Sequence, residues 1–158
     1  MIVLILNNIR SNENVGSIFR TADAAGVSKI VLCGYTPMPL DRFGRENKKL
    51  SKVSLGAEKF VEWEKAESLK SASEKLRKDN FKIIGVEQDK KAIDYKKIKR
   101  RVVGSQYLAL VFGNEVRGLS KEDLGLCDLV IEIPMKGKKE SLNVSVAVGI
   151  VLYEILRI

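Results

Sequence analysis

Histidine is absent from this chain of 158 residues. Its absence excludes Ser-His and Cys-His nucleophile arrangements, which need an imidazole base, and it removes the commonest metal ligand. The only two cysteines, Cys33 and Cys127, lie far apart and neither has a paired-ligand spacing. We therefore expect buried, reduced thiols and no metal site. Any chemistry has to use arginine, glutamate, serine, asparagine or lysine side chains.

Long apolar runs are also absent, because none approaches the roughly 18 residues that suggest a membrane span. The apolar run 2–6 has no basic stretch before it and meets Asn7 and Asn8 at once. It is therefore predicted to be a strand and not a signal peptide, and a cytoplasmic protein without a membrane partner is expected. The Gly-x-Gly-x-x-Gly and Gly-x-x-x-x-Gly-Lys-Ser/Thr motifs are missing. Their absence argues against a Rossmann dinucleotide site and a P-loop.

Basic residues are plentiful, and the formal net charge is +8. One run holds seven lysines and arginines between Lys90 and Arg101. A second run consists of Arg42, Arg45, Lys48, Lys49 and Lys52. Such runs can be no more than solvated faces, but a concentrated cluster attracts phosphates and releases their counterions. The charge therefore favours a nucleic acid as partner.

Apolar residues make up 45% of the chain, which together with the length predicts one domain over 1–158. Short and nearly continuous apolar runs predict strands at 2–6, 29–33, 81–86, 108–112 and 129–133. Runs of this kind are typical of strands that are covered on both faces. We therefore expect an α/β fold with a mostly parallel sheet flanked by helices. Long loops are expected at 34–50 and 88–105.

Helical spacing of apolar residues appears between the first two predicted strands. Its members share one face and are Val15, Ile18, Phe19, Ala22 and Ala25, and Gly26 supplies the stop. A second amphipathic helix is predicted over 66–80. Ser120 and Asp123 have the spacing of a capping box and predict the start of a short helix.

The final segment has both alternating and helical spacing, and periodicity alone does not decide between them. A helix with Ser141 as its N-cap, running to Arg157, fits the length of the apolar run better. Because this helix would be apolar nearly all the way round, we expect it to be buried on several sides. A subunit interface would provide that burial.

Loops follow three of the predicted strands at comparable places. They begin with Gly85-Val86-Glu87, with Gly113-Asn114-Glu115 and with Pro134. The carboxyl ends of parallel strands gather binding loops, and backbone groups there can surround an adenine. Gly113 and Gly118 can also simply form a turn. These loops are the candidate ligand site.

Three motifs in the sequence have a known counterpart. They are Asn14-Val15-Gly16 with Arg20, the segment 112–118, and the segment 131–147. Together they resemble the motifs of the SpoU (TrmH) class of SPOUT RNA methyltransferases, over essentially the whole chain. The resemblance implies a deep C-terminal trefoil knot that holds S-adenosylmethionine, with the cofactor site over about 84–158. It also implies a homodimer that methylates a ribose 2′-hydroxyl of tRNA or rRNA, and we expect no separate RNA-binding extension.

The resemblance also assigns roles to individual residues. Those that match cofactor-contacting positions are Val86, Gly113, Ile133, Met135 and Leu142. Those that match catalytic or substrate-holding positions are Asn14, Arg20, Glu115, Ser141 and Asn143. By the same likeness, Arg20 of one protomer faces the cofactor of the other. A guanidinium with a pKa above ~12 is a poor base, so we expect Arg20 to orient the hydroxyl and a neighbouring phosphate.

Other interpretations exist for the same residues. Taken alone, Arg20 could be an exposed helical arginine, Glu115 could pair with Arg117 or Lys121, Ser141 could be only an N-cap and Asn143 only a turn residue. The whole chain could be an RNA-binding paralogue without catalysis. Residues 21–29 also resemble the turn of a helix-turn-helix regulator of DNA, but the next segment, 30–34, is apolar and β-branched, unlike a polar recognition helix.

Overall fold

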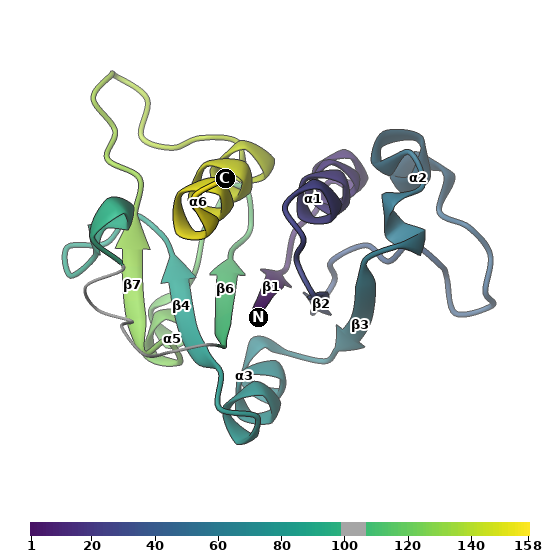
Figure 1. Ribbon diagram of the computed structural model, residues 1–158, viewed down its shortest axis with the longest axis horizontal. Coiled ribbons are helices and arrows are strands. Elements are labelled where there is room, and N and C mark those ends of the chain that lie inside the picture. Colours follow the sequence, from purple (N-terminus) through teal and green to yellow (C-terminus); the bar gives the residue numbers. More distant parts are fainter. Residues whose placement is uncertain (99–106) are drawn as a thin grey trace.

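The computed structural model describes residues 1–98 and 107–158. Within these residues the chain forms a seven-stranded sheet in the order β3-β2-β1-β6-β4-β7-β5, and all its pairings are parallel (Figure 1). The strands are β1 (Ile2–Asn7), β2 (Lys29–Cys33), β3 (Glu62–Ala66), β4 (Lys82–Val86), β5 (Ile93–Asp94), β6 (Leu108–Phe112) and β7 (Leu129–Glu132). The helices are α1 (Asn12–Ala24), α2 (Lys48–Ser54), α3 (Leu69–Lys78), α5 (Lys121–Gly125) and α6 (Val144–Leu156), with short turns η1 (Ala57–Lys59) and η2 (Tyr95–Lys97).

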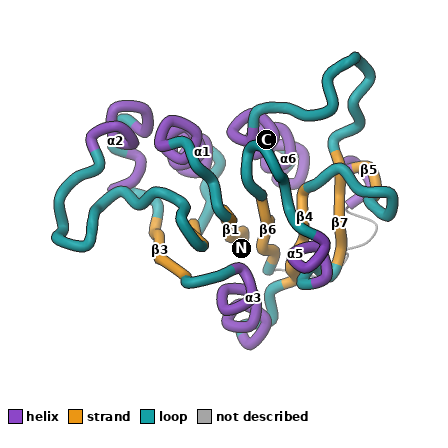
Figure 2. Tube along the Cα trace, turned by 180° about the vertical axis from the view of Figure 1, so that it is seen from behind, coloured by secondary structure: helices purple, strands orange, loops and turns teal. Residues whose placement is uncertain are grey.

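Helices cover both faces of the sheet. Figures 1 and 2 show α1, α2 and α6 on one face and α3 and α5 on the other. Successive side chains of a strand point to opposite faces. In β1, Leu4 and Leu6 therefore belong to the core under α1 and α6, whereas Val3 and Ile5 belong to the core under α3. The predicted α/β fold with a parallel sheet flanked by helices is confirmed.

Each of the five predicted strands is present, displaced by at most one residue at an end. The predicted helix between the first two strands is α1, and Gly26 with a φ of +70° follows its last turn. The helix predicted over 66–80 is α3, which is shorter at both ends. Ser120 caps α5 in the predicted capping box with Asp123. Local apolar patterning and capping chemistry thus located these elements correctly.

The N-cap of the last helix is a correction. The cap is Asn143, whose Oδ1 accepts a hydrogen bond of 2.8 Å from the backbone N of Ser145, and not Ser141. The chain stays non-helical through Leu142, whose side chain lines a cleft, and becomes helical at Val144, where burial on the sheet begins. Ser141 is therefore free of a capping role.

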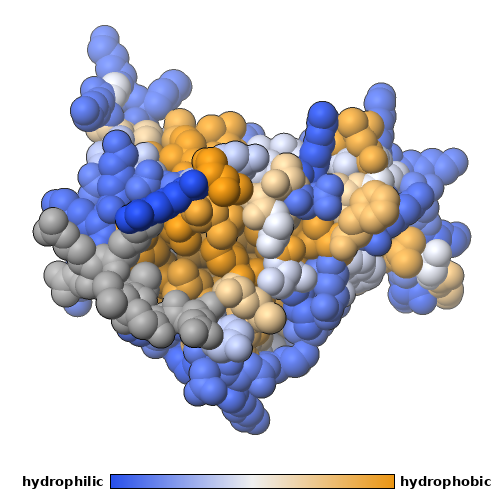
Figure 3. All heavy atoms as spheres, viewed as in Figure 1, coloured by the Kyte–Doolittle hydropathy of each residue, from blue (hydrophilic) through white to orange (hydrophobic). Residues whose placement is uncertain are grey.

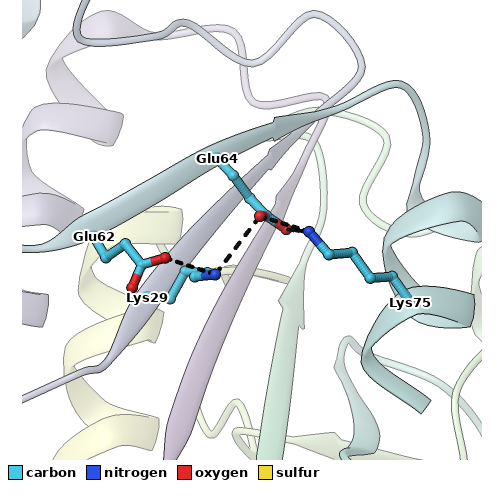
Figure 4. A network of polar contacts seen from close by, with 4 residues as sticks. All are labelled: Lys29, Glu62, Glu64 and Lys75. Carbon is cyan, nitrogen blue, oxygen red and sulfur yellow. Dashed lines mark hydrogen bonds and ion pairs between the residues drawn. The ribbon is translucent and has the colours of Figure 1, made fainter. Parts of the chain in front are cut away.

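The edge strand β3 was not predicted, because three of its five residues, Glu62, Glu64 and Lys65, are charged. Ion pairs hold it in place (Figure 4). Lys29 Nζ of β2 lies 2.7 Å from Glu62 Oε1 and 3.6 Å from Glu64 Oε2, and Lys75 Nζ of α3 lies 2.8 Å from Glu64 Oε2. Charged residues are common on edge strands, where they oppose pairing with another chain. The residues of β3 are exposed or only partly buried, so an apolar run is not required for this strand.

Two further elements lie in segments predicted as loops. The helix α2 begins near the end of the 34–50 segment, and its backbone packs closely on α1 at Gly16, where an added Cβ would lie 2.6 Å from Leu50 O. The two-residue strand β5 lies within 88–105. Residues 99–106 of that segment lie outside the described residues. None of the helices in the described parts of the chain has the length and apolar character of a membrane span.

Candidate functional site

A cleft of about 260 Å³ opens where β4, β6 and β7 end. Its walls come from 86–88, 112–118 and 133–144, the three segments that follow these strands, and from Ala147 of α6. All five residues expected at a cofactor line this one cleft, namely Val86, Gly113, Ile133, Met135 and Leu142. The structure therefore brings residues of the second and third motifs together with Val86, which lies outside the motifs.

The wall contributed by the loop after β6 is a tight turn. Gly118 N donates a hydrogen bond of 2.9 Å to Asn114 O, and Gly118 has a φ of +64°. A Cβ on Gly113 would lie 2.5 Å from the Gly118 carbonyl carbon and 2.6 Å from Leu119 N. Only glycine permits this approach. From the sequence alone, Gly113 is part of either a turn or a ligand site. The two interpretations are compatible, because this turn forms a wall of the cleft.

Asn114 anchors this turn, although sequence reasoning gave it no role. Its side chain is buried, and its Nδ2 donates to Asn8 O at 2.9 Å and to Tyr35 Oη at 3.0 Å. Its Oδ1 accepts from the backbone N atoms of Val116 and Arg117, both at 2.9 Å. A glycine and an asparagine in succession after a buried strand are a recognisable turn signal, so Asn114 could have been found.

Glu87 and Gln88 connect the three loops of the cleft and were likewise missed. Glu87 Oε2 accepts a hydrogen bond of 2.7 Å from Leu119 N in the loop after β6. Gln88 Nε2 donates to Ile133 O at 2.7 Å, in the loop after β7. Their position directly after β4 was the available signal, but which loop each side chain reaches depends on the order of the strands.

At the edge of the cleft, Glu115 joins the first and second motifs. Its Oε2 accepts a hydrogen bond from Arg10 N at 2.8 Å, and its Oε1 accepts from Ser11 N and from Asn14 Nδ2, both at 3.0 Å. Asn143 Nδ2 of the third motif donates to Asn14 Oδ1 at 3.0 Å. We call Glu115, Asn14 and Asn143 the polar network. It links residues that the sequence separates by more than a hundred positions.

The electrostatics of Glu115 follow from these contacts. Partial burial would by itself raise its pKa, but the hydrogen bonds from Arg10 N, Ser11 N and Asn14 hold the pKa below the ordinary value of 4.5. The carboxylate is therefore ionised at neutral pH. Within the described residues it forms no ion pair with Arg117 or Lys121, so its partners are backbone and amide groups.

The two remaining predicted site residues differ in position. Ser141 lines the cleft and is exposed. Arg20 is exposed on α1, does not line the cleft of its own chain, and has no hydrogen-bond or ion-pair partner within 1–98 and 107–158. The single chain therefore leaves the Arg20 guanidinium available to a group outside the chain.

The cysteines take no part in this site. Cys33 is fully buried and Cys127 is partly buried, and both are free thiols. Burial raises the pKa of each thiol to about 12, so both are protonated at neutral pH. The predicted buried, reduced thiols are confirmed for Cys33 and hold in part for Cys127.

Comparison with known proteins decides the family. The model of the SpoU rRNA Methylase family matches residues 1–153. The chain belongs to the SpoU family. Membership implies the knotted C-terminal region expected from the motifs. In the structure α6 packs against both α1 and η2. The helix-turn-helix interpretation is wrong, because the segment after α1 is the buried strand β2.

Individual relatives agree with this assignment. The chain is 35% identical over 155 residues to a Staphylococcus aureus (strain COL) protein named for the TrmH family of tRNA/rRNA methyltransferases, covering 98% of this chain. It spans 58% of the length of that relative.

Two solved structures superpose on it closely. The A. aeolicus TrmH/SpoU tRNA modifying enzyme has a TM-score of 0.82 and 29% identity, over 99% of this chain and 74% of that one. An AdoMet-bound rRNA methyltransferase from Sinorhizobium meliloti has a TM-score of 0.83 and 28% identity, over 99% and 56%.

Proposed function

We propose that this chain binds S-adenosylmethionine and methylates a ribose 2′-hydroxyl of tRNA or rRNA. The observation that carries the proposal is that the five expected cofactor residues line one cleft, with the polar network at its edge. The family, the AdoMet-bound S. meliloti relative and the tRNA/rRNA methyltransferases among the relatives support it.

The residues of the cleft fit this cofactor. The side chains of Val86, Ile133 and Leu142 offer apolar contacts to an adenine ring, and backbone groups of the three loops offer hydrogen bonds to its edge. The carboxylates of Glu87 and Glu140 also line the cleft and favour a positively charged ligand. When bound, S-adenosylmethionine supplies a methyl group on a positively charged sulfur.

The task of the protein residues is alignment of the attacking oxygen. Holding two reactants in line can supply roughly 7–11 kcal/mol of the barrier reduction. The Arg20 guanidinium would orient the hydroxyl and a neighbouring phosphate, because it is a poor base but a good donor to oxygen anions. Glu115 and Asn143 hold Asn14 in a single orientation beside the cleft, and Ser141 adds a hydroxyl to the cleft wall.

A homodimer is part of this proposal. Figure 3 shows an apolar patch over α6, and the exposed fractions of Val146 and Tyr153 on that helix are 49% and 40%. Pairing through α6 and α1 would cover these side chains and would bring Arg20 of one protomer toward the cleft of the other. The position of Arg20 outside its own cleft supports this arrangement.

The experiment that tests the proposal separates binding from transfer. Calorimetry with S-adenosylmethionine should show binding, and transfer of labelled methyl to unmodified tRNA and rRNA transcripts should give alkali-resistant 2′-O-methylated linkages. In the Arg20→Ala variant, methyl transfer should be abolished while cofactor affinity stays nearly unchanged. The matched control is Lys78→Ala, which removes an exposed cation from α3 on the other face of the sheet.

The other outcomes are equally informative. Loss of cofactor affinity in Arg20→Ala would place the guanidinium in the cofactor cleft itself. Binding of both ligands by the unaltered chain without any transfer would instead support the inactive paralogue.

Charge reversal at Lys96 and Lys97 should weaken RNA binding and reduce its salt dependence. Arg100 and Arg101, which belong to the same prediction, lie outside the described residues.

A further inference from the structure

The segment between β2 and α2 carries an exposed aromatic ring with two arginine guanidinium groups close to it. We call residues 38–47 the 38–47 loop; in Figure 1 it extends outward beside α2. The Phe43 side chain is 66% exposed. The Arg42 guanidinium carbon lies 4.7 Å from the centre of the Phe43 ring, and that of Arg45 lies 5.1 Å from it. Exposure of an apolar ring of this size to water is unfavourable, so the ring does not stabilise a loop that is only solvated.

The loop is internally ordered by Asp41. Its Oδ1 accepts hydrogen bonds from Phe43 N at 2.8 Å and Arg45 N at 2.9 Å, and its Oδ2 accepts from Arg45 Nε at 2.8 Å. Asp41 N also donates to Arg45 O at 2.9 Å, and Gly44 turns the chain with a φ of +75°. The hydrogen bonds from Arg45 N, Arg45 Nε and Phe43 N hold the pKa of the Asp41 carboxyl below its ordinary value. The ring and the two guanidinium groups are therefore displayed by a preformed turn.

The base of the loop is tied to the helix that carries the first motif. Asn47 N donates to Pro39 O at 2.8 Å and closes the loop. The Asn47 Nδ2 group donates to Asn12 Oδ1 of α1 at 2.6 Å. Asn12 lies two positions before Asn14, a member of the polar network. The loop therefore has a defined position relative to the candidate catalytic residues.

The surroundings of the loop suit a nucleotide. An open hollow of about 610 Å³ beside it is lined by three cations and two carboxylates together with Met38, Leu40 and Asn47; the charged residues are Arg45, Lys48, Lys49, Asp41 and Glu46. Lys48, Lys49 and Lys52 of α2 continue the basic run of Arg42 and Arg45. In Figure 3 the right-hand edge of the molecule, where the loop lies, combines many hydrophilic spheres with a few apolar ones. Positive charge beside an exposed ring is the chemistry that binds phosphate and base together.

We infer that the 38–47 loop is a platform for an unpaired nucleotide of the substrate RNA, with the base stacked on the Phe43 and arginine side chains and the phosphates on Arg42 and Lys48. The inference rests on the proposed function, since RNA is the partner in both. Stacking selects bases that are free of a duplex, because paired bases hide their faces. The loop would therefore restrict methylation to RNA in which a single-stranded residue lies near the target ribose.

The test measures binding of a fluorescein-labelled 12-nucleotide oligouridylate and of an RNA duplex of the same length. Phe43→Ala should weaken binding of the single strand by at least about five-fold, because base stacking on an aromatic side chain supplies that much or more. Binding of the duplex should be unchanged, and Phe43→Trp should retain single-strand affinity. Arg42→Gln should reduce the slope of log K against log salt concentration by about 0.7.

A matched control is available in Phe60→Ala, since Phe60 is 79% exposed but has no arginine over its ring within the described residues. It should bind both RNAs like the unaltered chain. Unchanged single-strand affinity in Phe43→Ala, or an equal loss for the duplex, would overturn the inference. A change of oligomeric state in Phe43→Ala, seen by light scattering, would also overturn it by making the loop a subunit contact.

Failure of this inference can be told from failure of the proposed function. The 38–47 loop does not line the cofactor cleft, so Phe43→Ala should bind S-adenosylmethionine like the unaltered chain. If the unaltered chain binds the cofactor and methylates RNA but Phe43→Ala does so equally well, only the loop inference is wrong. If the unaltered chain binds no cofactor, the proposed function is wrong.

Discussion

At the scale of single residues, Glu115 has the most consequential contacts. One carboxylate accepts two backbone N–H groups at the start of α1 and the amide of Asn14, which in turn accepts from Asn143. Hydrogen bonds to a charged acceptor contribute about 1.5–3 kcal/mol each before solvent exposure weakens them. This side chain therefore both orients the candidate catalytic residues and stabilises the junction between distant segments.

Glu115→Gln should destabilise the protein by about 1–2 kcal/mol at pH 7, because the amide presents an N–H group where the carboxylate accepted hydrogen bonds. The measurement is urea unfolding of both proteins over a range of pH. The pKa of Glu115 is below 4.5 in the folded state, so its contribution is present above pH 4.5 and is lost as the pH falls through the folded pKa. The two proteins should therefore converge in stability below pH 4.5. A constant difference at acid pH would contradict this account.

Gly113→Ala should reduce both stability and cofactor affinity, because the new Cβ would collide with the backbone of Gly118 and Leu119. Backbone atoms cannot move aside as a flexible side chain can, so the cleft wall has to shift. Calorimetry and thermal unfolding measure the two effects. Gly125→Ala in α5 is the control, since nothing lies within 4 Å of its added Cβ. Equal behaviour of the two variants would mean that the turn after β6 tolerates displacement.

At the scale of elements, β3 shows how charge replaces apolar burial at the edge of a sheet. Glu64 lies between Lys29 and Lys75, whereas among the described residues Glu62 forms an ion pair with Lys29 alone and has a side chain that is 67% exposed. Partial burial would raise the pKa of Glu64, but the hydrogen bond from Lys75 and the charge of Lys29 hold it below the ordinary value. The middle carboxylate thus connects β2, β3 and α3 (Figure 4).

Glu64→Gln should lower stability by about 0.5–1 kcal/mol, and Glu62→Gln should lower it by less, because isolated exposed ion pairs contribute little. Urea unfolding can be followed through the fluorescence of Trp63, the only tryptophan, which lies in β3 itself. High salt should reduce the effect of Glu64→Gln. A larger loss in Glu62→Gln would mean that the pair with Lys29 alone holds the strand.

At the scale of the whole molecule, Arg20 is separated from the candidate cofactor cleft of its own chain. The cofactor cleft is lined by the ends of β4, β6 and β7, by the loops that follow them and by Val144 and Ala147 of α6, whereas Arg20 lies outside it on α1. The proposed pairing through α6 would supply the missing arginine from the partner. Cofactor binding and methyl transfer should therefore depend differently on dimerisation.

Val146→Asp should produce monomers that still bind S-adenosylmethionine but no longer transfer methyl groups. Val146 is 49% exposed, so a charge there should be tolerated by the monomer but disfavoured in an apolar interface. Light scattering, calorimetry and transfer of labelled methyl measure the three properties. Phe60→Ser, which changes an exposed ring away from α6, should leave all three unaltered. A monomer that retains full transfer would show that transfer does not need an arginine from the partner.

Local patterning was enough to locate the buried strands, because strands covered on both faces have to be apolar along their length, and helical spacing located α1 and α3. The three motifs were identified by their resemblance to the SpoU class. The remaining elements and the contacts between the motifs depend on the tertiary structure. The edge strands β3 and β5 are held by neighbours distant in the sequence, and the cap of α6 depends on where the chain meets the sheet. The contacts of Asn14 with Glu115 and Asn143 span 101 and 129 positions. Such contacts depend on the order of strands in space, which no local pattern contains.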